Sequence, residues 1–130
     1  MNDTTLLAVN GTLMRGLGLN HNMLAAGGTF VREDRTDACY RIWSIGDRHP
    51  GMIRVKSGGV SVSLEVWRLP MAGLGGLLLS EPAGLSIGKV VLADGSEVLG
   101  VLAEPWLLEG QTEITDKGGW REYTGHHFTP

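Results

Sequence analysis

The sequence predicts an α+β domain whose sheet curls toward a barrel, with short flanking helices. Short apolar or alternating runs, which are typical of strands, recur along the chain, whereas only two or three segments have a helical pattern. The 20 glycines among 130 residues supply the turns and bends that such a sheet requires. With 42% hydrophobic residues, we expect residues 1–130 to form one domain with a well-filled core.

The N-terminal part is expected to alternate between strand and helix. Residues 4–10 form an apolar strand, and a glycine-bearing loop over 11–16 connects it to a short helix over 17–26. Two further strands are predicted over 29–34 and 38–45, and the second of these alternates between apolar and polar side chains. The strand over 4–10 that leads directly into the glycine-bearing loop over 11–16 is the first feature of the sequence that suggests a functional site.

In the middle of the chain we expect a hairpin and then a helix. Residues 52–56 and 60–69 are predicted to pair as strands across Ser57-Gly58-Gly59. Pro70 is suited to the first turn of a helix, where its missing N–H costs nothing, and this helix is expected to run to about Ser80.

A second hairpin is the clearest local signal in the C-terminal part. Asp94-Gly95 has the residues that a two-residue primed turn favours, and it joins predicted strands over 89–93 and 96–103. The segment "DKGGWREYTG" is expected to hold a last helical turn.

Composition excludes several classes of function. A net charge of −3 and a pI near 5.7 argue against a nucleic-acid partner, because phosphate binding needs a basic surface. No stretch approaches a membrane span and no leader is expected, so the chain is predicted to be soluble and cytoplasmic. Cys39 is the single cysteine, so it is expected to be a buried apolar side chain and not part of a disulfide or a metal cage.

Two motifs are weighed and set aside. "GLSIG" places Ser86 in the G-x-S-x-G pattern, but a nucleophile elbow needs a helix after the serine, and a hairpin is predicted there. His126-His127 resembles a metal pair, yet adjacent strand residues point to opposite faces and no carboxylate or cysteine is spaced to complete a site. No metal site is predicted.

The loop after the first strand is the strongest candidate site. Backbone N–H groups where a loop enters a helix lack internal partners, and they favour an anion. Arg15 supplies a guanidinium suited to a carboxylate, and His21 lies where it could exchange a proton. The same residues also fit a purely structural role, as a tight turn, a surface arginine and a histidine with satisfied hydrogen bonds.

Two carboxylates stand out from the other acidic residues. Glu65 lies inside the apolar strand "VSLEVW", on the face of Ser63 and Trp67, and could line a pocket. Glu81 follows the predicted second helix and precedes Pro82, in a loop, where functional residues often lie.

The strand and loop "LLAVNGTLMRG", followed by "HPGMIRV" and "VSLEVWRL", resembles the γ-glutamylcyclotransferase-like fold, with Asn10 where that family has a tyrosine. A narrower likeness covers about residues 6 to 123. "GLGLNHNMLAAGGTFVREDRT", "YRIW", "LEVWRLP", "GLSIGKVVLADGSEVLGVLAEP" and "ITDKGGWREY" together look like the C-terminal domain of allophanate hydrolase, here without the amidase domain. The resemblance implies a mixed, partly closed sheet.

The resemblance also implies a function. It suggests an N-carboxyurea-type decarboxylation in urea metabolism, in which a histidine of an "LNH" motif, here His21, delivers the proton, without a metal or organic cofactor. Residues expected to bind the small carboxylate or carbamate are the loop residues and three side chains brought to it: Asn10, Gly11, Thr12, Leu13, Met14, Arg15, Tyr40, Arg41 and Glu65.

Two alternatives stay open. A γ-glutamylcyclotransferase needs a glutamate to move protons during ring closure, and Glu81 is the nearest match, offset by about one position. A non-catalytic module that assembles with a separate amidase is the other, since fold likeness alone does not establish activity. A homodimer is expected, because twofold pairs are the commonest assemblies.

Overall fold

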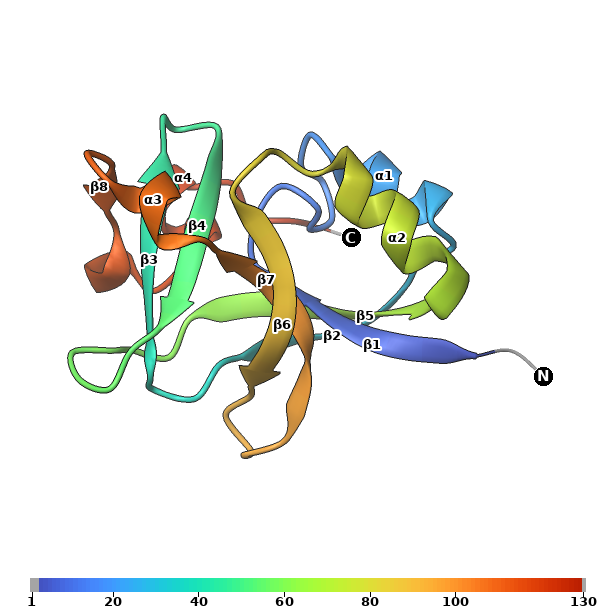
Figure 1. The fold of residues 1–130 in the computed structure, drawn as a ribbon, viewed down its shortest axis with the longest axis horizontal. Helices are drawn as coiled ribbons and strands as arrows, with labels where there is room; N and C mark the ends of the chain where they lie inside the picture. Colours follow the sequence, from blue (N-terminus) through green and yellow to red (C-terminus); the bar gives the residue numbers. More distant parts are fainter. Residues whose placement is uncertain (1–2, 130) are drawn as a thin grey trace.

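The computed structural model describes residues 3–129 and arranges them as two sheets with short helices around them (Figure 1). The larger sheet has the order β2-β5-β1-β7-β6, from β1 (Thr4–Val9), β2 (Thr29–Arg35), β5 (Ser63–Pro70), β6 (Leu85–Val91) and β7 (Glu97–Ala103). The smaller has the order β4-β3-β8, from β3 (Tyr40–Ile45), β4 (His49–Arg54) and β8 (Thr112–Glu113). The helical segments are α1 (Asn20–Ala25), α2 (Met71–Ser80), α3 (Pro105–Leu108), the 3-10 turn η1 (Thr115–Lys117) and α4 (Trp120–Thr124). The predicted α+β class is confirmed.

β1 is the central strand of the larger sheet. It pairs antiparallel with β5 and parallel with β7, whereas the other pairs of this sheet are antiparallel. Figure 1 shows β6 and β7 running across the direction of β1 and β5, so the sheet is mixed and strongly curled. A central strand must be apolar on both faces, and Leu7, Ala8 and Val9 are all buried.

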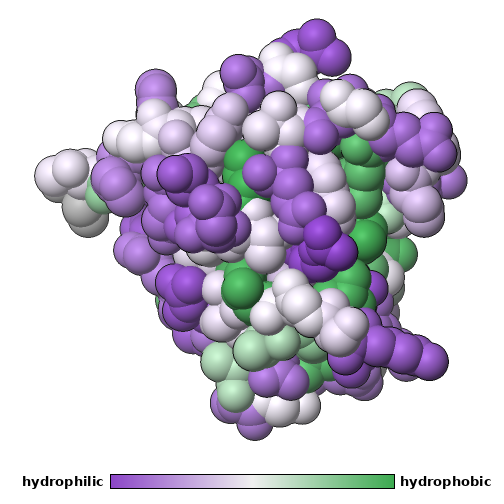
Figure 2. Space-filling model, turned by 90° about the vertical axis from the view of Figure 1, so that its left-hand side faces the viewer, coloured by the Kyte–Doolittle hydropathy of each residue, from purple (hydrophilic) through white to green (hydrophobic). Residues whose placement is uncertain are grey.

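The core lies between the two sheets and continues into the loop after β1. Val66 and Leu69 of β5 and Ile42 of β3 are fully buried, and Leu13 and Met14 of the loop belong to the same cluster. The outer surface of the molecule on the side of β8 and α3 is mostly hydrophilic (Figure 2). The loop is therefore held by its own buried side chains and has a defined path.

Several predicted elements are confirmed with small shifts at their ends. The first strand ends at Val9, the second helix spans 71–80, and the Asp94-Gly95 turn joins β6 to β7. β6 begins at Leu85, so Ser86 lies within a strand of an antiparallel hairpin, as expected from its context. α4 is the predicted last helical turn, and Cys39 is partly buried against the core.

The predicted hairpin between 52–56 and 60–69 is wrong. β4 pairs with β3, while β5 lies between β1 and β2. β5 is buried along most of its length, so it takes a central place, and the turn at Gly46 and Asp47, both with positive φ, already pairs β4 with its predecessor.

The first helix is shorter than expected and three elements were not predicted. Hydrogen-bonded turns occupy the chain from Gly11 to Leu19, with Met14 N–H donating to Gly11 O and Leu17 N–H to Met14 O, so α1 begins only at Asn20. The elements α3, β8 and η1 are two to four residues long, too short to show a period in the sequence. Within residues 3–129, no helix has the length and apolar character needed to cross a membrane.

Candidate functional site

The loop that leaves β1 is pressed against the start of β4. A Cβ atom on Gly11 would lie 2.5 Å from Cδ of Pro50, so the close approach of the two segments requires glycine at this position. Two and three residues later, Leu13 and Met14 anchor the loop, because their side chains are buried in the core. The position of the loop backbone is therefore determined by the glycine at position 11 and by the buried side chains of Leu13 and Met14.

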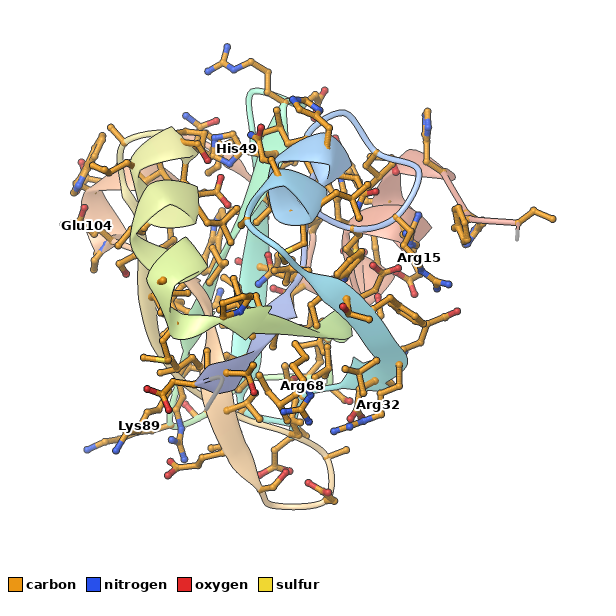
Figure 3. All side chains as sticks on the ribbon, turned by 90° about the vertical axis from the view of Figure 1, so that its right-hand side faces the viewer. Arg15, Arg32, His49, Arg68, Lys89 and Glu104 are labelled. Carbon is orange, nitrogen blue, oxygen red and sulfur yellow. The ribbon has the colours of Figure 1, made fainter. Side chains whose placement is uncertain are left out.

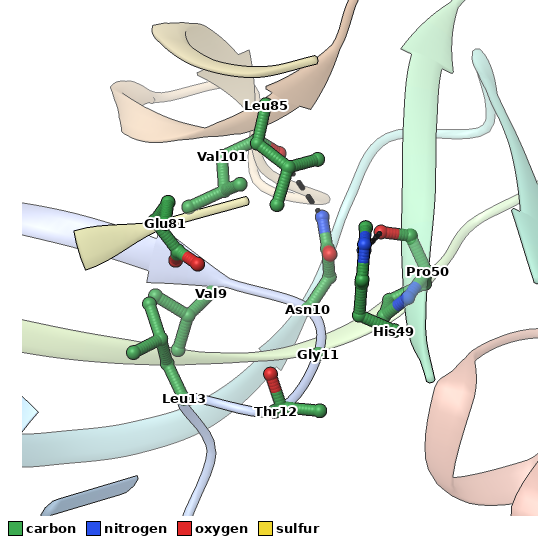
Figure 4. Close-up of a pocket in the computed structure, with 10 residues that line it drawn as sticks. All are labelled: Val9, Asn10, Gly11, Thr12, Leu13, His49, Pro50, Glu81, Leu85 and Val101. Atoms are coloured by element: carbon green, nitrogen blue, oxygen red, sulfur yellow. Dashed lines mark hydrogen bonds between the residues drawn. The ribbon is translucent and has the colours of Figure 1, made fainter. Parts of the chain in front are cut away.

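A small pocket opens over this loop (Figure 4). It contains about 250 Å³ of unfilled space, part of it open to solvent. Its walls come from the end of β1, the loop, the start of β4, the residue after α2 and two strands of the larger sheet: Val9, Asn10, Gly11, Thr12, Leu13, His49, Pro50, Glu81, Leu85 and Val101. The packing of the two sheets thus brings four distant parts of the chain to one site.

Three loop residues that line this pocket have backbone N–H groups without an acceptor. Met14 N–H donates to Gly11 O at 3.0 Å and Arg15 N–H donates to Glu65 Oε1 at 2.9 Å. By contrast, the N–H groups of Gly11, Thr12 and Leu13 have no acceptor among residues 3–129. Unused N–H groups that lie in sequence form a surface suited to a small anion.

Glu81 supplies a carboxyl group on the opposite wall. Figure 4 shows the carboxyl directed toward the space above Asn10 and Leu13. It forms neither a hydrogen bond nor an ion pair with the described part of the chain, and desolvation by burial raises its pKa from 4.5 to about 6. A carboxyl group with such a pKa can hold or release a proton near neutral pH, which is the property required of a general acid or base.

Asn10 and His49 are the other polar side chains deep in the pocket. Asn10 is 4% exposed, and its Nδ2 donates to Val101 O at 3.1 Å. His49 is 8% exposed, and its Nδ1 lies 3.1 Å from Pro50 O. His49 was not among the residues predicted from the sequence, although "HPG" belongs to a segment that carried the family likeness. The missing information was that β4 begins at this residue and lies against the loop.

Glu65 lies near the far end of the loop and outside the pocket. Its carboxylate accepts hydrogen bonds from Arg15 N–H at 2.9 Å, Arg15 Nε at 3.1 Å, Arg121 Nη2 at 3.0 Å and Trp67 Nε1 at 3.1 Å. Arg15 also stacks on Phe30, 3.5 Å from its ring centroid, and in Figure 3 it lies on the other side of α1 from His49. The expected Arg15 and Glu65 thus meet each other, and they hold the loop instead of lining its pocket.

Tyr40 and Arg41 are also placed away from the pocket. Tyr40 is fully buried and its hydroxyl accepts a hydrogen bond from Val91 N–H at 3.0 Å, while burial raises its pKa. Arg41 is on the opposite face of β3 and forms a two-point ion pair with the exposed Glu113, at 2.6 and 2.8 Å. The expectation that both side chains join the loop is corrected, because strand alternation sends one into the core and the other outward.

His21 lies on the outer face of α1. It is exposed, it shares this face with Leu24, which is 58% exposed, and it does not line the pocket. Met23, on the other face, is the buried residue of the helix. The catalytic role of His21 stays a prediction.

Other polar groups offer no second centre. Within residues 3–129, no three His, Cys, Asp or Glu side chains are grouped as a metal ion would need. Ser86 Oγ donates to Leu102 O at 3.4 Å within the β6–β7 hairpin and has no neighbouring base among these contacts.

The mixed, strongly curled sheet with β1 at its centre has the γ-glutamylcyclotransferase-like fold. The crystal structure of an AIG2-like protein from Mus musculus shares this fold, with a TM-score of 0.62 at 18% identity over 98% of this chain and 97% of that one.

Within this class, the chain belongs to the allophanate hydrolase C-terminal domain family, whose model matches residues 5–125. It is 29% identical to Kluyveromyces lactis allophanate hydrolase, with a TM-score of 0.89 over 95% of this chain and 21% of that one. Urea amidolyase of Saccharomyces cerevisiae is 29% identical over 124 residues, which are 90% of this chain but 7% of the yeast protein. A solved uropathogenic E. coli-specific protein is 73% identical, with a TM-score of 0.95 over 96% of this chain and 98% of that one. The chain therefore spans a small part of the two named enzymes.

Proposed function

We propose that the pocket binds a small carboxylate or carbamate derived from urea, of the N-carboxyurea type, and promotes loss of CO₂ from it. The observation that carries this proposal is the Glu81 carboxyl, unpartnered and with a raised pKa, opposite the unused N–H groups of Gly11, Thr12 and Leu13. The names of the relatives, allophanate hydrolase and urea amidolyase, support a role in urea metabolism.

The chemistry requires one proton at one atom. In N-carboxyurea the bond between nitrogen and the carboxylate carbon breaks, CO₂ leaves, and the bonding electron pair stays on nitrogen. Protonated Glu81 transfers its proton to that nitrogen, which gives urea, and the carboxylate then regains a proton from water. The loop N–H groups orient the carboxylate, but they must hold it weakly, since tight binding of the ground state opposes decarboxylation.

The decisive experiment compares Glu81→Gln with His21→Ala. N-carboxyurea prepared in alkali is diluted into neutral buffer with and without protein, and the release of urea and CO₂ is measured. Because Glu81 lines the pocket and His21 is exposed outside it, Glu81→Gln should lose ~10²–10⁴-fold in rate, and His21→Ala should keep the wild-type rate. Loss of activity in His21→Ala with an active Glu81→Gln would assign the proton to the histidine instead.

A γ-glutamylcyclotransferase activity is the second candidate, because Glu81 faces the loop as the proton-moving glutamate of that class would. Formation of 5-oxoproline from γ-glutamyl dipeptides tests it, with Glu81→Gln inactive. If neither reaction occurs, alone or with an added amidase, an assembly module is the remaining function. Light scattering, alone and in the mixture, tests both the proposed homodimer and the proposed amidase partner.

A further inference from the structure

The side chain of Asn20, the first residue of α1, is hydrogen-bonded to the loop after β1. Its amide lies 2.8 Å from Leu13 O, and because a carbonyl oxygen only accepts hydrogen bonds, the donor is Asn20 Nδ2. One residue earlier, the backbone N–H of Leu19 donates to Thr12 O at 3.0 Å. The start of α1 therefore holds two consecutive carbonyl groups of the loop, although neither Leu19 nor Asn20 lines the pocket.

A carbonyl that is held in this way also fixes the N–H group of its own peptide unit. In a planar trans peptide, the C=O of one residue and the N–H of the next point in opposite directions. The bond to Thr12 O thus fixes the N–H of Leu13, which has no acceptor within residues 3–129. The bond to Leu13 O fixes the N–H of Met14, which donates to Gly11 O at 3.0 Å. That second bond fixes the N–H of Thr12, which likewise has no acceptor in this part of the chain.

The histidine of the same "LNH" segment is placed differently. His21 is exposed and does not line the pocket, whereas the two residues before it, Leu19 and Asn20, hold the loop. We infer that Asn20 is a positioning residue, which keeps the loop peptides in the orientation that leaves their N–H groups, and not their carbonyl oxygens, free for an anion. This inference rests on the proposed function, since it concerns the loop that the proposed ligand contacts.

Removal of the Asn20 amide releases the peptide between Leu13 and Met14. If this peptide turns over, Met14 N–H leaves Gly11 O, and the N–H of Thr12 is no longer fixed. A bound anion then loses a donor or meets a carbonyl oxygen in its place. Since hydrogen bonds to charged groups are among the stronger ones, this loss corresponds to about 10- to 100-fold in affinity.

Asn20→Asp tests the inference with a side chain of almost the same shape, because a carboxylate cannot donate to Leu13 O. By titration calorimetry, the affinity for malonate, a small dicarboxylate used in place of the proposed ligand, should fall about 10- to 100-fold. Asn20→Ala, which adds no charge, should lower it in the same direction. The matched control is Asn22→Asp, which adds the same charge to α1 at a residue whose side chain is not hydrogen-bonded to the loop. Its affinity should stay close to the wild-type value.

NMR spectroscopy of the loop distinguishes positioning from a general loss of structure. In wild-type protein, a scalar coupling across the hydrogen bond should connect the side-chain nitrogen of Asn20 with the carbonyl carbon of Leu13, and its absence overturns the inference without any variant. In Asn20→Asp and Asn20→Ala, the backbone amide signals of residues 11–14 should shift, while those of β5 and β7 keep their positions.

The remaining outcomes separate the inference from the proposed function. Variants of Asn20 that bind malonate as tightly as wild-type protein, or that lose the signals of the strands together with those of the loop, overturn the inference alone. If wild-type protein itself does not bind malonate, the proposed function fails and the inference fails with it.

Discussion

Two carboxyl groups lie on either side of one loop and differ in every contact they make. Glu65 is 1% exposed and receives hydrogen bonds from Arg15, Arg121 and Trp67. Glu81 is also desolvated but receives none within residues 3–129, and its pKa rises to about 6. Desolvation penalises both charges, and only one of them is compensated. The compensated carboxylate fixes the loop, whereas the uncompensated one is available to a ligand.

The largest expected effect is on stability, at Glu65. Glu65→Gln leaves two largely buried guanidinium groups, Arg15 and Arg121, without their shared counter-charge, which should cost about 3–5 kcal/mol of unfolding free energy. Denaturant unfolding measures this cost. The control is Glu33→Gln, since Glu33 is 77% exposed and pairs with the same Arg15; it should cost about 0–1 kcal/mol. Equal costs for the two variants contradict the comparison.

Next is the glycine that holds the loop against β4. Gly11→Ala drives a methyl group into the ring of Pro50, so the variant should lose about 1–3 kcal/mol of stability and its affinity for malonate. Gly75→Ala is the matched control, because it lies in α2 with open space around it. That change should stabilise the protein by about 0.5–1 kcal/mol without altering binding. A Gly11→Ala variant with wild-type affinity would show that the loop is not held in this way.

The carboxyl of Glu81 is expected to have a smaller effect, on how the free energy of unfolding depends on pH. Its pKa is raised from 4.5 to about 6 in the folded protein, so the folded state binds more protons than the unfolded state between these values. The resulting contribution to stability is complete below about pH 4.5 and is lost as pH rises through 6, a change of up to about 2 kcal/mol. Wild-type protein should lose this stability between pH 4.5 and 7 in unfolding experiments, relative to Glu81→Gln. If the stability of wild type and of Glu81→Gln changes with pH in the same way, the raised pKa of Glu81 is contradicted.

The smallest effect is expected at Arg41. Its guanidinium is satisfied by Glu113 at the surface, away from the pocket. Arg41→Gln should therefore change stability by about 0–1 kcal/mol and leave the calorimetric affinity for malonate at the wild-type value. A marked loss of affinity would return Arg41 to the binding site that its sequence position first suggested.

The sequence correctly predicted those elements that depend on interactions between neighbouring residues. The Asp94-Gly95 hairpin and the helix after Pro70 are determined by neighbouring residues, and both are present. The partner of β5 depends on segments far away in the chain, so a nearby glycine turn gave the wrong pairing. Within the site, the loop and Glu81 were anticipated. His49 was not anticipated, because its place in the pocket depends on the contact between β4 and the loop. The places of Tyr40 and Arg41 were not predicted either, because alternation alone does not tell which face of β3 is directed toward the core.

The central place of β1 has a consequence for how the chain folds. Its partners are β5 and β7, so β1 must wait for residues up to 103 before both of its edges are paired. Sheets that depend on such distant pairings fold more slowly than helical proteins of the same size. The pocket is lined by residues of β1, β4, the end of α2 and β7, so a nascent chain that ends before Val101 does not contain it. Ligand binding can therefore begin only after the residues up to Val101 have been synthesised.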